Sequence, residues 1–147
     1  MKPVLLGLAA ALLVSGCGSE PTTGGEPAAR EDVELRLRQI YDMSEGAYVE
    51  GSNSFVRVEG ADGDEVAETR LDEGSRLEEL KVLSTATLRL APGSYRLVSF
   101  QRPCAGDCGA LDPPTDECSA DLRLDAGRPV EATITVLPGQ GCTIELR

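Results

Sequence analysis

The stretch that decides the fold is ADLRLDAGRPVEATITV, residues 120–136. Apolar and charged residues alternate one by one over 120–125, and apolar and polar residues alternate again over 130–136. A period of two is the signature of a strand with one buried face. Gly127 and Pro129 interrupt the alternation and indicate a turn. The stretch therefore predicts two consecutive, half-buried β-strands.

The same kind of signal continues outward from this stretch. Further strand candidates are residues 33–38, 54–59, 65–71, 80–90, 94–100 and 142–146. Asp62-Gly63, Pro92-Gly93 and Pro138-Gly139 separate several of them as turn signals. The one helical candidate, residues 72–81, is short, and a turn is the other interpretation of it. We predict an all-β protein, a single small antiparallel β-sandwich of seven or eight strands, with a small barrel as the competing arrangement.

The first residues carry an export signal. Lys2 precedes an almost wholly apolar run over 4–14, and Ser15-Gly16 supplies the small residues of a cleavage site. The run is too short to span a membrane. The site ends on Cys17, so Val14-Ser15-Gly16-Cys17 resembles the lipobox of bacterial lipoproteins, whose cysteine receives a diacylglyceryl group and a further acyl chain such as palmitate. A plain secretory signal, with Cys17 in a disulfide, is the alternative.

The chain divides into three parts on these grounds. Residues 1–16 are predicted to be the signal peptide. Residues 17–31 are predicted to be a lipid-anchored flexible tether, because GSEPTTGGEPAAR over 18–30 contains no large apolar residue. Residues 32–147 are predicted to be the β-sandwich domain. The expected location is the extracytoplasmic face of the cell membrane, held there by the lipid.

Composition excludes some partners. The formal net charge is −11, and it becomes one unit more negative when Lys2 leaves with the signal peptide. Nucleic acid is not an expected partner, because binding to phosphates depends on clustered Lys and Arg. The expected partner besides the membrane is an envelope protein or a ligand that the sequence does not identify. The oligomeric state cannot be predicted from the sequence.

The cysteines other than Cys17 form an even set: Cys104, Cys108, Cys118 and Cys142. Disulfides are expected in an oxidising compartment, and the spacing lacks the paired Cys-x2-Cys motifs of zinc sites. Strand parity favours Cys118–Cys142 as a bridge between two sheets and Cys104–Cys108 as a small loop. If the last three strands share one sheet, Cys118 and Cys142 are about 9 to 10 Å apart and cannot pair.

Acidic residues gather between these cysteines, in a segment predicted to be a loop. Asp107, Asp112, Asp116 and Glu117 lie there together with Pro113-Pro114. Loops on a rigid scaffold carry binding more often than strands do, so these four acids are the candidate partner-binding residues. We expect replacement of Asp107, Asp112 and Asp116 together by alanine to weaken partner binding and to change the melting temperature little, because exposed acids contribute little to stability. Calcium binding is the alternative, although the spacing matches no EF-hand.

Catalysis is not expected. The chain has no histidine, which removes the commonest general base and the usual nucleophile–histidine pairs. No catalytic residue, metal ligand or cofactor is predicted. A carboxylate pair in a cleft is the one arrangement that would make the protein a hydrolase.

Two segments also carry a family resemblance. LRLAPGSYRLVSF at 88–100 and LRLDAGRPVEATITV at 122–136 resemble carboxypeptidase regulatory-like and collagen-adhesin B-type domains, which share a transthyretin-like β-sandwich. RPCAGDCGALDPPTDEC at 102–118 departs from that pattern and is similar to small surface lipoproteins of actinobacteria. The resemblance implies a non-catalytic binding or structural module of the cell envelope. The alternative is an accessory lipoprotein that binds a small ligand or cation through the acidic loop.

Overall fold

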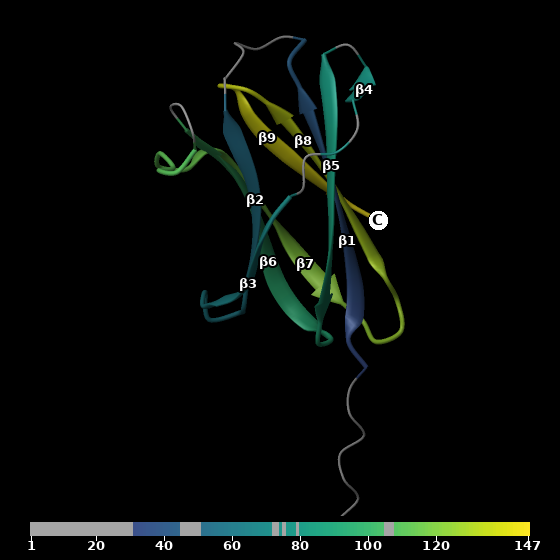
Figure 1. Ribbon diagram of the computed structural model, residues 1–147. Coiled ribbons are helices and arrows are strands. Elements are labelled where there is room, and N and C mark those ends of the chain that lie inside the picture. Colours follow the sequence, from purple (N-terminus) through teal and green to yellow (C-terminus); the bar gives the residue numbers. More distant parts are fainter. Residues whose placement is uncertain (1–30, 45–50, 72–73, 75, 79, 105–107) are drawn as a thin grey trace, which may run out of the picture.

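The computed structural model describes residues 31–44, 51–71, 74, 76–78, 80–104 and 108–147 (Figure 1). The signal-peptide and tether predictions up to residue 30, Cys17 and Asp107 lie outside these ranges. Within the described ranges, no helix has the length and apolar character needed to cross a membrane.

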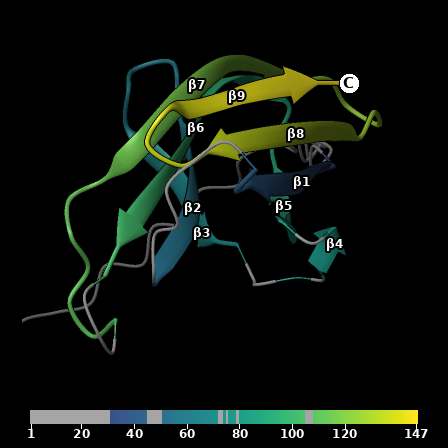
Figure 2. The ribbon, with the colours of Figure 1, turned by 90° about the horizontal axis from the view of Figure 1, so that it is seen from above.

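The described chain forms a two-layer β-sandwich (Figures 1 and 2). One sheet has the strand order β4-β5-β1-β8-β9, and the other has the order β3-β2-β6-β7. The predicted all-β sandwich is confirmed. The strands are β1 Val33–Asp42, β2 Ser52–Glu59, β3 Glu65–Arg70, β4 Arg76–Glu78, β5 Lys81–Leu90, β6 Gly93–Pro103, β7 Thr115–Leu124, β8 Val130–Leu137 and β9 Gly141–Leu146.

The strands differ from the expectation in three ways. The described residues contain nine strands rather than seven or eight, because β4 (Arg76–Glu78) occupies part of the segment that was ambiguous between helix and turn. β7 begins at Thr115, so Asp116 and Glu117 belong to a strand and not to a loop. One pair of neighbours, β1 and β8, is parallel, whereas every other pair is antiparallel.

β8 can run parallel to β1 because the chain changes sheets immediately before β8. The turn over 125–129 joins β7 in the four-stranded sheet to β8 in the five-stranded sheet. Ala91 and Pro92, beside the predicted turn at Pro92-Gly93, likewise join β5 to β6 across the two layers. Tyr95 braces this crossing, because its hydroxyl donates to the Ala91 carbonyl at 2.8 Å. A tyrosine bonded a few residues upstream is a known corner element of β-sandwiches.

Alternation along each strand builds the core as the pattern predicted. Leu35 and Leu37 of β1 and Val56 and Val58 of β2 belong to one buried cluster between the sheets, and all four are nearly inaccessible to solvent. The buried cluster consists of Val33, Leu35, Leu37, Val56, Val58, Leu71, Leu90, Leu97, Leu122, Leu124, Ala132, Ile134 and Val136. Phe55 points the other way and stacks on Phe100 at 5.6 Å between ring centroids, on the outer face of the smaller sheet.

The register gives the sandwich two distinct ends. At the proximal end, the chain enters β1 at Val33, which lies opposite Leu90. The turns over 60–64, 91–92 and 125–129 also lie there. At the distal end, β1 finishes at Asp42, opposite Lys81, and β6 finishes at Pro103, opposite Ser52. The turn over 138–140 and the segment over 108–114 belong to the distal end.

Candidate functional site

Both cysteine pairs favoured by strand parity are present. Cys118 and Cys142 are bonded with their Cα atoms 5.4 Å apart, and Cys104 and Cys108 are bonded with their Cα atoms 4.9 Å apart. The first disulfide fastens β7 of one sheet to β9 of the other, and Figure 2 shows these two edge strands on the same side of the sandwich. The arrangement that forbade this pairing, three final strands in one sheet, does not occur. Both bonds lie at the distal end.

The segment after Cys108 is held by its backbone. The Arg102 guanidinium donates to the carbonyl oxygens of Leu111 and Asp112, each at 3.0 Å. The Asp112 amide donates in turn to the Pro103 carbonyl at 2.8 Å. These bonds fix the backbone while leaving the Asp112 side chain exposed, and the Glu117 side chain is exposed as well. Two of the four predicted acids are therefore displayed to solvent near the distal end.

Asp116 has a different position from the one predicted. Its Oδ1 accepts hydrogen bonds from the amides of Gly139 at 3.0 Å and Gly141 at 3.1 Å. The carboxylate therefore caps the β8–β9 turn from the neighbouring strand, and its own backbone has a positive φ of 48°. The expectation that Asp116 is an exposed acid of little structural consequence is wrong. Its partners lie 23 and 25 residues away, so no local sequence signal revealed them.

The described acids do not converge on one point. Within the part of the chain that the structure describes, no group of three or more His, Cys, Asp or Glu residues is arranged to hold a metal ion. Asp112 lies in the loop that Arg102 holds, and Glu117 lies on β7. The Asp116 carboxylate already accepts hydrogen bonds from two backbone amides. Asp107, the fourth acid of the calcium interpretation, lies outside the described residues.

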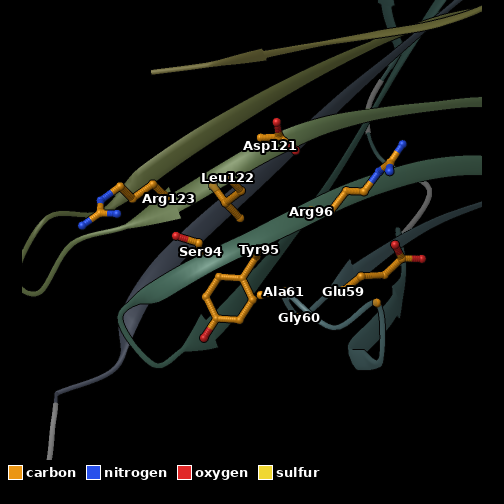
Figure 3. A pocket seen from close by; sticks show the side chains of 10 residues that line it. Glu59, Gly60, Ala61, Ser94, Tyr95, Arg96, Asp121, Leu122 and Arg123 are labelled. Carbon is orange, nitrogen blue, oxygen red and sulfur yellow. The ribbon is translucent and has the colours of Figure 1, made fainter.

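A shallow notch at the proximal end was missed by the sequence analysis (Figure 3). Register places Glu59, Arg96 and Asp121 in one row across β2, β6 and β7. The β2–β3 turn closes one side, and Tyr95 and Leu122 form part of the wall. The hollow has a volume of about 530 Å³ and is lined by Glu59, Gly60, Ala61, Gly63, Ser94, Tyr95, Arg96, Asp121, Leu122 and Arg123.

Acidic and basic side chains both line the notch, and they do not converge on a reactive group. Arg96 donates to the Ser119 hydroxyl at 2.8 Å, and the Tyr95 hydroxyl donates to the Ala91 carbonyl. Glu59 and Asp121 lie on strands separated by β6, and Arg96 stands between them. Such a row suits weak contacts with polar molecules. It contains no nucleophile–base pair.

The shifted pKa values elsewhere in the domain reflect local ion pairs and hydrogen bonds. The pKa of Asp42 is lowered because its carboxylate accepts from the hydroxyl and the amide of Ser44, with a smaller contribution from Lys81. The pKa of Glu34 is lowered by Arg36 and, more weakly, by Arg89. The pKa of Arg57 is raised by Glu68. These groups lie on strand faces and ends and do not form a common site.

Comparison with known proteins identifies no family for this chain. No family model and no curated protein matches the chain. One solved structure with a similar arrangement is described as a "putative cell adhesion protein" from Bacteroides ovatus, with a TM-score of 0.48 and 13% sequence identity. The match covers 80% of this chain and 44% of that protein, so the chain spans less than half of its length. Nothing about partners or activity is transferred from it.

Proposed function

We propose that the protein is a lipid-anchored, non-catalytic module of the cell envelope that presents its distal end to a partner on the extracytoplasmic side. The observation that carries this proposal is the polarity of the sandwich. The chain enters the domain at Val33 at the proximal end, and both disulfides and the segment over 108–114 lie at the opposite end. A lipid on Cys17 would therefore leave the distal end facing away from the membrane.

The dimensions support this orientation. β1 contains 10 residues, which corresponds to about 33 Å at roughly 3.3 Å per residue. A tether over 17–31 with the predicted coil-like character adds about 20 Å on average. The distal end would then stand several Debye lengths, each about 8 Å, from the lipid headgroups. At that distance the distal end is not repelled by anionic lipid while it binds a partner.

The disulfides support the proposed compartment. Disulfides persist in oxidising, extracytoplasmic surroundings and are rare in the cytosol. Both cysteine pairs are bonded, so these four thiols are neither nucleophiles nor metal ligands. Together with the absence of histidine from the sequence, this supports binding or a structural role rather than catalysis.

The anchor is tested by Cys17→Ser, with Ser15→Ala as the control that keeps a small residue before the cysteine. We expect Cys17→Ser to lose labelling by an alkyne fatty acid and to leave the membrane fraction, and Ser15→Ala to behave like the natural protein. Fractionation followed by in-gel detection of the label gives both results. Retention of the fatty-acid label on Cys17→Ser would contradict the proposal.

The partner-facing end is tested by removing charge at one end at a time. Asp112→Asn with Glu117→Gln neutralises the two displayed acids of the distal end. Asp62→Asn with Glu131→Gln removes the same charge from exposed positions elsewhere. After cross-linking on intact cells, we expect the first pair to reduce the yield of cross-linked partner and the second to leave it unchanged. The reverse result would move the binding surface to the proximal notch or the sheet faces.

A cation-binding role for the same acids gives a different outcome. If calcium is the ligand, millimolar calcium should raise the melting temperature of the natural protein and not of Asp112→Asn with Glu117→Gln. On the proposal made here, calcium has the same small effect on both, since the described acids form no cluster of three ligands.

A further inference from the structure

At one level of the sandwich, the inward-facing side chains of four strands change from apolar to polar. Along β1, the inward-facing residues Leu35 and Leu37 are followed by Gln39, and along β6 Leu97 is followed by Ser99 and Gln101. β5 and β2 change in the same way. We call the group at this level the polar layer; it consists of Gln39, Ser52, Ser54, Ser84, Ser99 and Gln101.

Register brings the members of the polar layer together within each sheet. Gln39 of β1 lies opposite Ser84 of β5, and Ser54 of β2 lies opposite Gln101 of β6. Between the sheets, the Gln39 amide nitrogen reaches the Ser99 hydroxyl at 3.5 Å, a long and weak contact. The polar layer therefore spans the gap between the two sheets rather than lying on one of them.

Four of the six members of the layer are buried, whereas Ser52 and Ser54 on β2 are partly exposed. Gln39 and Ser99 are 0% exposed, Gln101 is 1% exposed and Ser84 is 7% exposed. Burial of an amide costs free energy unless each polar atom has a partner. Gln101 partly meets this requirement, because its Oε1 accepts from the hydroxyl of Ser54 at 2.8 Å and from that of Ser52 at 3.4 Å.

Two buried atoms of the layer have no partner among the described residues: Oε1 of Gln39 and Nε2 of Gln101. One is an acceptor and the other is a donor. The Gln39 side chain contacts the Ser99 hydroxyl through its Nε2, and Gln101 is the next inward-facing residue of β6 after Ser99. Rotating either side-chain amide by 180° changes which of its two polar atoms is unpaired, but it does not change the number of unpaired atoms. Native proteins seldom leave such atoms unpaired.

We propose that the polar layer is a binding site for internal water, with a water molecule bridging Oε1 of Gln39 and Nε2 of Gln101. Water donates to the first atom and accepts from the second, and buried waters typically make about three hydrogen bonds to groups of this kind. Ser99 offers the third partner. Two glutamines and four serines supply no formal charge, so an ion placed there would lose its hydration without an opposite charge to compensate it. The low exposure of the layer restricts the guest to the smallest polar molecules.

The test is a measurement of water contacts on the full chain purified in detergent, by nuclear Overhauser spectroscopy. We expect cross-peaks between water and the side-chain amide protons of Gln39 and Gln101. Their sign should be the one that indicates a long-lived bound water molecule. The methyl groups of Leu35 and Val58, which are buried at the proximal side of the layer, should show none and serve as the internal control. Absence of water contacts at both amides would overturn the proposal. A crystal structure showing a direct Gln39–Gln101 bond, or a cation between them, would overturn it equally.

A pair of variants ties the water to these two side chains. Gln39→Met with Gln101→Met keeps the length of both side chains and removes their polar ends. We expect water contacts at the β protons of Ser99 to disappear in this double variant, while the contact pattern around Val58 stays unchanged. Unchanged water contacts at Ser99 would show that the two amides do not hold the water. If the double variant does not fold, the measurement on the natural protein still decides the proposal.

Discussion

At the proximal side of the sandwich, strands β1 and β6 place Leu35 and Leu97 in the interior, whereas further along the same strands they place Gln39 and Gln101 there. All four side chains are no more than 1% exposed. The aliphatic half is stabilised by burial of apolar surface, which is non-directional. The distal half still buries Ile134 and Val136 of β8, and it adds specific connections: one disulfide between the sheets, one closing a small loop, and the Asp116 carboxylate on a turn.

This difference shows how a small domain can carry a polar interior at the end proposed to meet a partner. Hydrogen-bonded and covalent connections specify positions more narrowly than aliphatic contacts do. They also tolerate less substitution, because removing one member leaves a buried group unpaired. The predictions below compare the two halves, beginning with the largest expected effect.

The sharpest comparison uses two neighbouring inward positions on β6. Leu97→Ala should lower the free energy of unfolding by about 4 kcal/mol, because it removes a fully buried aliphatic group and leaves a cavity. Ser99→Ala, equally buried, should cost about 1 kcal/mol, the net value of a typical hydrogen bond. Urea denaturation of both variants measures the difference. Equal losses would mean that the two halves of the interior contribute in the same way.

The two disulfides should contribute unequally. Cys118→Ala with Cys142→Ala releases a loop of sequence separation 24 and should cost about 3.5 kcal/mol in the chain-entropy account. Cys104→Ala with Cys108→Ala releases a separation of 4 and should cost about 2 kcal/mol. Urea denaturation under non-reducing conditions tests both. A larger loss from the second pair would indicate that the small loop, rather than the bridge between sheets, fixes the distal end.

The Asp116 contact is tested by Asp116→Ala, with Asp116→Asn as the matched control. Loss of the carboxylate that caps two glycine amides should lower stability by about 2 kcal/mol, since hydrogen bonds to charged groups are the stronger ones. Asparagine keeps an acceptor and tolerates a positive φ, so we expect a clearly smaller loss. Thermal unfolding of the two variants gives the order. No loss in Asp116→Ala would restore the sequence-based expectation of an exposed acid.

At the proximal end, Tyr95→Phe removes the hydroxyl that bonds to Ala91. The expected cost is about 1 kcal/mol, because the bond is a single neutral one and the ring is retained. Chemical denaturation provides the measurement. A loss as large as that of Asp116→Ala would show that the β5–β6 crossing is as dependent on one polar contact as the distal turn is.

The smallest effect concerns pH. The folded-state pKa of Asp42 is lowered, so the stabilisation from its ionised form is present above the ordinary pKa of an aspartate. That stabilisation is lost as the pH falls through the lowered value. Ser44→Ala removes the largest cause of the shift, and we expect the pKa of Asp42 to rise toward its ordinary value. Carboxyl titration by NMR measures it. An unchanged pKa would assign the shift to the Ser44 amide, which this variant keeps, and to Lys81.

Much of the fold could be predicted because alternation is a local property. The strands β2, β3, β8 and β9 fall within two residues of the expected positions, and Val56 and Val58 are buried on the predicted face. β1 and β7 extend further than expected, to Asp42 and from Thr115. In both cases the added residues are polar or mixed, so pairing with neighbouring strands rather than an apolar pattern defines them.

The candidate site was predictable only in part. The choice of cysteine partners followed from strand parity, but it depended on whether β7 and β9 share a sheet. The prediction of four displayed acids correctly identified Asp112 and Glu117 as exposed. It failed at Asp116, whose partners lie on a different sheet, and it did not find the row of Glu59, Arg96 and Asp121, because strand order brings these residues together.

By itself, the sequence determined the all-β class and the inward face of most strands. These depend on side-chain periodicity and on composition, which act over a few residues. The tertiary structure alone decided which consecutive strands change sheets and that β1 runs parallel to β8. It also decided that six uncharged polar residues from four strands meet at one level. The physical reason is that these features depend on contacts between residues far apart in sequence, whose geometry is set only when both sheets pack.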